Sequence, residues 1–191
     1  MTRQTDQPLE HRSLNATNRE ASGLVNLVRE GDLLLDTPYQ RGDVWTLDQR
    51  VALVKSWLLG LPIPALIIND RLGAFWGETH HDDIDFAYAM IDGKQRITTA
   101  AMWFGSDFAV PASWFPEGEV SVTERTPDGP YVLFSGLTVI GQRRFMRRAL
   151  IPVCEARVKT VREEAEIYLL VNGAGTPQSD EDMERARRIA D

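Results

Sequence analysis

Residues 91–99 of the chain read Ile91-Asp92-Gly93-Lys94-Gln95-Arg96-Ile97-Thr98-Thr99. The apolar run before them, residues 86–90, is typical of a buried strand, and the run after them is typical of a helix that ends at Gly105. A glycine at such a turn lets the backbone come close to a ligand, and the first amides of a helix favour an anion such as phosphate. The stretch therefore predicts a strand, a tight turn and a helix with a polar, phosphate-binding start.

The composition is that of an acidic chain, and we expect no targeting segment. Its 191 residues carry 28 acidic and 21 basic side chains, a formal net charge of −7. This argues against wholesale wrapping of nucleic acid, although a local basic face stays compatible with DNA contact. The single cysteine, Cys154, excludes an internal disulfide and is expected to be a small, half-buried residue. Because there is no signal-peptide core and the longest apolar region, residues 58–68, is too short to span a bilayer, we expect a cytoplasmic protein.

Capping patterns and apolar runs predict the secondary structure. Three Thr-x-x-Glu/Gln patterns, beginning at Thr17, Thr46 and Thr160, predict helix starts, because the two side chains can satisfy each other's backbone amides. Glycines are expected to end these helices at positions 31, 60 and 173. Helices are also predicted over 94–104 and 142–150, strands over 33–35, 65–68, 86–91, 131–134 and 151–158, and irregular structure over 105–130.

The mixture of helices and short strands lacks strict alternation, which favours an α+β fold. The chain is long enough for one domain with a real core. We expect a flexible arm over residues 1–16, one domain over 17–173 with a small mixed sheet flanked by helices, and a charged C-terminal helix of the same domain over 174–191.

The side chains of the opening stretch are of types that handle phosphate. Lys94 and Arg96 can neutralise phosphate charge, and Arg96 offers a two-pronged fork to phosphate oxygens. Asp92 can hold a metal ion or polarise a water, Gln95 can orient an attacking water, and Thr98 can add a hydroxyl contact. An ordinary helix start with solvated charges accounts for these residue types equally well.

A second turn, Tyr39-Gln40-Arg41-Gly42-Asp43-Val44-Trp45, repeats the arrangement. A Gln-Arg pair again follows a predicted strand and precedes a capped helix, so Gln40 and Arg41 can join the same phosphate site. Tyr39 offers a ring for stacking on a base, whereas a plain turn with Trp45 packed on the helix is the structural alternative. Two such turns in one small domain favour convergence on a single ligand.

Three other groups of residues have functional types but also a plain structural explanation. Asn172 and Thr176 flank two glycines and can bind a ligand, or they belong to a helix end followed by a turn. The His80–Asp85 loop lacks spaced metal ligands and is expected to be solvated. The densest basic patch is the best candidate for DNA phosphates, although a solvated helix face explains it too. It comprises Arg143, Arg144, Arg147 and Arg148.

Four motifs in order resemble one known family. They are Pro38-Tyr39-Gln40-Arg41 with Trp45, Gly60-Leu61-Pro62-Ile63-Pro64, the 91–96 turn, and Val171-Asn172-Gly173-Ala174-Gly175-Thr176-Pro177 with Ser179. Together they resemble the N-terminal domain of GmrSD-type restriction endonucleases, in the wider ParB/sulfiredoxin-like group. The resemblance covers about residues 20 to 190 and implies a ParB/sulfiredoxin-like α+β fold that binds a nucleotide.

The resemblance also implies roles for individual residues. The family's Asp-Gly-Gln-Gln-Arg box, linked to NTP hydrolysis, falls on residues 92–96, and its first box falls on Gln40 and Arg41. Catalysis would fall to Asp92, Gln95 and Arg96, with Asp92 as a Mg²⁺ ligand. Nucleotide contacts would come from Gln40, Arg41, Gly93, Lys94, Thr98, Asn172 and Thr176.

The chain departs from the family pattern in ways that bear on function. Lys94 stands where relatives usually have Gln, Ala174 replaces a Gly, and Gln178 replaces a Leu. Nothing here resembles the His-Asn-His nuclease domain that relatives usually carry, so we do not expect this chain to cut DNA alone, and a separate nuclease subunit is a candidate partner.

The leading interpretation is a domain that binds, and hydrolyses, a nucleoside triphosphate with Mg²⁺ in DNA restriction or modification. A non-catalytic DNA- or partner-binding regulator switched by nucleotide is one alternative. A phosphotransferase acting on DNA or a small hydroxyl compound is the other.

Overall fold

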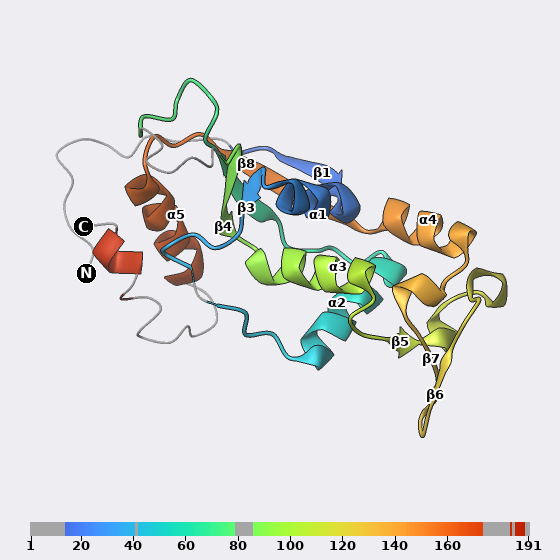
Figure 1. Cartoon of the computed structure of the whole chain (residues 1–191). Coiled ribbons are helices and arrows are strands. Elements are labelled where there is room, and N and C mark those ends of the chain that lie inside the picture. The colour runs from blue at the N-terminus through green and yellow to red at the C-terminus, as the bar shows by residue number, and fades with distance from the viewer. Residues whose placement is uncertain (1–13, 41, 79–85, 174–183, 185, 190–191) are drawn as a thin grey trace.

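A mixed five-stranded sheet forms the centre of the fold (Figure 1). The structure is a computed structural model and describes residues 14–40, 42–78, 86–173, 184 and 186–189. Parallel pairs join β2 to β4 and β3 to β8, and antiparallel pairs join β3 to β4 and β1 to β8. The predicted α+β class is therefore confirmed. In sheet order the strands are β1 (Ala16–Glu20), β8 (Leu150–Ala156), β3 (Leu66–Asp70), β4 (Tyr88–Asp92) and β2 (Leu33–Leu34).

Helices cover both faces of this sheet. Successive residues of a strand point to opposite faces, and Met90 and Ile91 of β4 are both fully buried but belong to different apolar clusters. The Met90 cluster includes residues of α1 (Ala21–Glu30), α2 (Leu47–Leu59) and α3 (Lys94–Gly105). The Ile91 cluster includes residues of α5 (Val161–Gly173). Figure 1 accordingly shows α5 on the side of the sheet away from α1 and α3.

The helix starts agree with the capping patterns in part. At Thr46 both bonds of the capping box form, and Gly31 and Gly60 end their helices in the left-handed conformation. At Thr160 the hydroxyl accepts the Glu163 N–H at 3.2 Å, but the Glu163 carboxylate accepts the Lys159 N–H instead. The helix start predicted at Thr17 is wrong, because residues 16–20 pair with β8 as strand β1 and the helix that ends at Gly31 starts only at Ala21.

A small second sheet occupies part of the stretch predicted to be irregular. Its order is β5 (Val110–Pro111), β7 (Gly129–Val132) and β6 (Glu124–Thr126). The prediction over 105–130 was wrong at these strands, because strands this short, rich in Gly, Pro and exposed charge, show no alternation. Between them or next to them lie three 3₁₀ turns, η1 (Ala112–Trp114), η2 (Glu117–Glu119) and η3 (Phe134–Gly136).

The C-terminal half differs from prediction mainly at element boundaries. Helix α4 runs from Val139 to Arg148, earlier than expected, because the Thr138 hydroxyl caps it by accepting the Gly141 N–H. Strand β8 follows closely, and Cys154 lies half-buried on it as expected. The arm predicted over residues 1–16 and the charged helix predicted over 174–191 lie mostly outside the described residues. Within the described part of the chain, no helix has the length and apolarity that a membrane crossing requires.

Candidate functional site

A cavity of about 590 Å³ opens at the amino end of α3. The two Gln-containing turns and the end of α5 meet there although they are far apart in the sequence. Arg41 and Thr176 lie outside the described residues, and Thr98, half-buried on α3, does not line the cavity. The predicted site residues that do line it are Gln40, Asp92, Gly93, Lys94, Gln95, Arg96 and Asn172.

The turn at Gly93 presents the first amides of α3 at the cavity. Gly93 has φ +107° and precedes the first residue of α3. The first helical hydrogen bonds are donated by Arg96 N and Ile97 N, at 3.0 and 3.3 Å, and both go to Gly93 O. The N–H groups of Lys94 and Gln95 therefore precede the hydrogen-bonded turn and lie at the positive end of the helix dipole.

Two cations flank these amides, and each is held by a carboxylate. Arg96 donates from Nη2 to Asp92 Oδ2 at 2.7 Å and from Nη1 to Pro64 O at 2.8 Å. Lys94 Nζ donates to Asp36 Oδ1, whose side chain is 85% exposed. An incoming anion would thus compete with carboxylates that are themselves partly or largely solvated.

Gln95 ties the second turn to α3. Its Oε1 accepts the N–H groups of Val44 and Trp45, both at 3.2 Å, and its Nε2 donates to Gly42 O at 2.9 Å. The side chain predicted to orient water therefore fixes the loop that carries Trp45. A role for Gln95 in orienting water stays a prediction, and it would require release of these bonds.

Gln40 supports the strand that leads into the turn. Strand β2 ends at Leu34, so its ladder with β4 stops there. Beyond it, Gln40 Nε2 donates to Met90 O at 2.7 Å and to Ile91 O at 2.8 Å, and Thr37 Oγ1 donates to Met90 O at 3.4 Å. Gln40 is only 8% exposed. Its side-chain amide supplies hydrogen bonds to β4 where the ladder with β2 has ended, just before the Gly93 turn.

A buried polar network lies beneath the site and was not predicted. Glu164 on α5 is fully buried and accepts from Arg71 Nε at 2.9 Å, Arg71 Nη2 at 2.5 Å and Asn69 Nδ2 at 2.8 Å. The Tyr39 hydroxyl lies 3.0 Å from Glu164 Oε2 and 3.2 Å from Met90 O, and can donate to either. The network joins α5 and the end of β3 to the segment that carries Gln40.

The protonation states in this network follow from burial and from Glu164. Burial, and then the negative charge of Glu164, raises the pKa of Tyr39 well above its usual value. Burial lowers the pKa of Arg71, but its hydrogen bonds and charge interaction with Glu164 outweigh this and raise it overall. Tyr39 therefore stays a neutral phenol and Arg71 a cation across physiological pH.

The sequence does carry a signal for Glu164. It falls on the apolar stripe of α5 with Val161, Ala165 and Tyr168, which pack in one cluster. An acidic residue on the apolar stripe of a predicted helix means that the helix prediction is wrong or that the acid is buried and paired with a cation.

The four arginines of α4 form a separate surface. None of them lines the cavity, and all four side chains reach solvent. Arg144 Nη1 pairs with Glu119 Oε1 at 2.6 Å, whereas Arg143, Arg147 and Arg148 pair with no acid in the described part of the chain. Figure 1 shows α4 at the end of the molecule opposite α5.

Comparison with known proteins gives one family. No curated protein and no solved structure matches the chain. Residues 22–172 match the family described as GmrSD restriction endonuclease, N-terminal domain, and this range holds every described residue that lines the cavity. The family points to a role in restriction systems. Because the match covers most of its length, the chain belongs to the GmrSD restriction endonuclease N-terminal domain family.

Proposed function

We propose that this domain binds a nucleoside triphosphate with Mg²⁺ at the amino end of α3 and hydrolyses it in the course of DNA restriction or modification. The observation that carries the proposal is the convergence of Lys94, Arg96 and the first amides of α3 on one cavity of about 590 Å³. Oriented amides and cations at a helix start are the usual means of holding phosphate. The family's link to restriction supports the biological setting.

The charges of the site suit a polyanion. Phosphate oxygens would take over the donors that Lys94 and Arg96 now give to Asp36 and Asp92. The two cations would then offset charge that develops on the transferred phosphoryl group, which is the main contribution proteins make to this reaction.

The donors present fit a Mg²⁺ ion carried by the nucleotide. Within the described residues no group of three or more His, Cys, Asp or Glu side chains is placed to hold a metal. Mg²⁺ in such sites is held by one or two carboxylates together with substrate phosphates, and Asp92 is a carboxylate that lines the cavity. Bound there, the ion would supply further neutralisation of phosphate charge.

Removing the charged residues of the turn should impair binding and turnover. We expect Arg96→Ala to raise the nucleotide Kd about 10- to 100-fold, because a charge-assisted hydrogen bond contributes about 1.5–3 kcal/mol. Asp92→Ala should abolish hydrolysis while nucleotide is still bound. The measurement is binding and phosphate release over a panel of nucleoside triphosphates, with and without Mg²⁺ and modified DNA.

The matched control is Arg162→Ala, which removes an exposed arginine paired with Glu166 on α5, outside the cavity. Binding without turnover in the unaltered domain would favour a nucleotide-switched regulator. Labelled phosphate on DNA or on an alcohol would favour a phosphotransferase. Equal binding and turnover in all variants would remove the proposal.

We also propose that α4 contacts DNA phosphates. Arg143, Arg147 and Arg148, which have no acid partner among the described residues, concentrate positive charge locally on a chain with net charge −7. Changing these three together to Gln should weaken duplex DNA binding. The slope of log K against log salt should become shallower by about 0.9 for each phosphate that the variant no longer neutralises.

The control for α4 makes the same change of charge elsewhere. Arg29, Arg125 and Arg157 are exposed, have no ion-pair partner among the described residues and lie outside α4. The triple Gln variant of these three should keep the steep salt dependence. If both triple variants change DNA binding alike, net charge and not α4 is responsible.

A further inference from the structure

The cavity has walls of two chemical kinds. The wall at the start of α3 is polar and charged. Other walls come from the loop before α2, from one face of α2 and from the 62–64 turn, and they are largely apolar, including Trp45, Leu53 and Ile63. Inorganic phosphates would gain nothing from such a wall, whereas the base and ribose of a nucleotide would.

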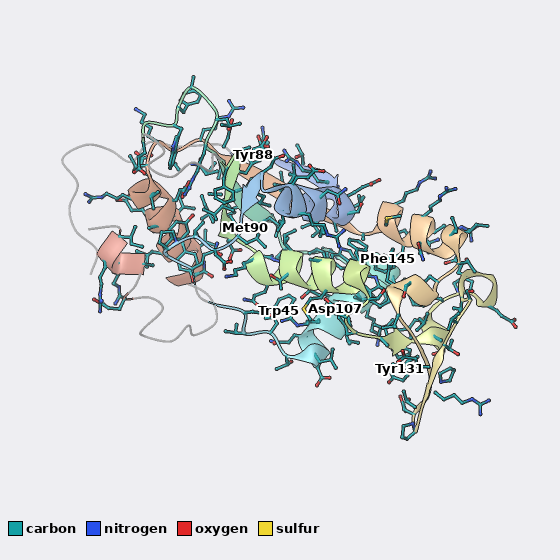
Figure 2. All side chains as sticks on the ribbon, in the orientation of Figure 1. Trp45, Tyr88, Met90, Asp107, Tyr131 and Phe145 are labelled. Carbon is teal, nitrogen blue, oxygen red and sulfur yellow. The ribbon has the colours of Figure 1, made fainter. Side chains whose placement is uncertain are left out.

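Trp45 is held at the junction of the two kinds of wall. Its N–H donates to Gln95 Oε1 in the first turn of α3, and the next residue, Thr46, caps α2. Its side chain is half-buried, packs against the core and lines the cavity. Figure 2 shows Trp45 beside the start of α2 and beneath α3. The ring is therefore fixed close to the place where phosphate would bind.

The adjoining face of α2 carries two small side chains at the cavity. Ala52 and Ser56, one turn apart, and Leu53 between them line the cavity, and the two small side chains leave room above the helix. Gln49 lines it one turn earlier. Its Oε1 accepts the Thr46 N–H at 2.9 Å, and no described residue accepts from its Nε2, which keeps two N–H donors for a ligand.

We propose that Trp45 and this face of α2 form the nucleoside subsite. The base lies against the indole ring, Leu53 lies behind it, and Gln49 Nε2 donates to an acceptor on the base edge. The proposal rests on the nucleotide binding proposed above and extends it to the substrate class: a nucleotide is recognised through its base, and not as a polyphosphate alone. A volume of about 590 Å³ is ample for such a ligand.

The test compares a nucleoside triphosphate with inorganic tripolyphosphate, each with Mg²⁺, by calorimetry. The unaltered domain should bind the nucleotide about 5- to 150-fold more tightly, the range that base–aromatic stacking supplies. Trp45→Ala should bring the nucleotide Kd to that of tripolyphosphate and leave the tripolyphosphate Kd unchanged. Trp45→Phe should keep most of the difference, because phenylalanine can still stack.

The control Trp114→Ala removes a half-buried tryptophan outside the cavity and should change neither Kd. Equal affinity for nucleotide and tripolyphosphate in the unaltered domain would overturn the subsite and leave the phosphate site standing. A Trp45→Ala variant that loses both ligands alike would also overturn it, because Trp45 would then support the fold or the phosphate wall. Failure of the unaltered domain to bind either ligand would overturn the proposed function itself.

Discussion

Glu164→Ala is expected to lower the free energy of unfolding by about 3–5 kcal/mol, because breaking a buried ion pair leaves the other charge uncompensated. The remaining charge would be Arg71, which is 9% exposed and makes two of its hydrogen bonds to Glu164. Asn69 and Tyr39 would also lose an acceptor in the interior. Urea unfolding at neutral pH, followed by circular dichroism, measures the change.

Glu166→Ala is the matched control on the same helix. Glu166 is exposed and pairs with Arg162 at 3.4 Å, so its loss should cost less than about 1 kcal/mol. A double variant tests whether the uncompensated Arg71 charge causes the loss of stability. In the double variant Glu164→Leu with Arg71→Met, both charges are gone, and most of the lost stability should return. If Glu164→Ala were no more harmful than Glu166→Ala, the network would not be stabilising.

The network also bears on the cavity, because of where its members lie. Tyr39 is next to Gln40, which donates a hydrogen bond to the strand that enters the Gly93 turn. Glu164 lies one turn before Tyr168 on α5, and Tyr168 and Asn172 line the cavity. Loss of Glu164 should therefore raise the nucleotide Kd even under conditions where the variant is folded.

Features that depend on neighbouring residues could be predicted from the sequence. The Thr46 capping box, the glycine helix ends and the strand-turn-helix around Gly93 all depend on residues close to one another in the chain. The same local logic failed at Thr17, where pairing with β8 offers five residues a sheet partner and outweighs a capping box.

The sequence predicted which residues belong to the candidate site, but not which hydrogen bonds they make. Gln40 and Gln95 do meet at one cavity, yet their amides bind the backbone of other segments, and this depends on tertiary placement. The Glu164–Arg71 pair joins residues 93 positions apart, and no local pattern selects that partner. Sequence spacing finds candidates for a site, whereas tertiary contacts determine which of them support it and which face the ligand.

Gly93→Ala is expected to lower the free energy of unfolding by about 2–5 kcal/mol, for two separable reasons. The backbone at Gly93 has φ +107°, which L-residues rarely adopt. A Cβ there would also lie 2.1 Å from Leu66 Cδ2 and 3.0 Å from Arg96 Nη2. Leu66 is fully buried in the core, so its side chain cannot simply turn away.

Gly31→Ala separates these two causes. Gly31 has φ +82°, but a Cβ there would meet nothing within 4 Å, so only the backbone cost of about 1–2 kcal/mol should appear. The excess of Gly93→Ala over Gly31→Ala then measures the collision with Leu66. Equal losses in the two variants would show that the core accommodates the methyl group.

A double-mutant cycle with Leu66→Ala locates the collision. Leu66→Ala alone should cost about 2–5 kcal/mol through the cavity that it leaves. A methyl group on residue 93 would enter part of that space, so the two changes together should cost less than their sum by about 1–3 kcal/mol. Additive losses would place the strain elsewhere, in the turn that presents the Lys94 and Gln95 amides. In that case, folded Gly93→Ala protein should have a higher nucleotide Kd than the unaltered domain, because the proposed phosphate site uses those amides.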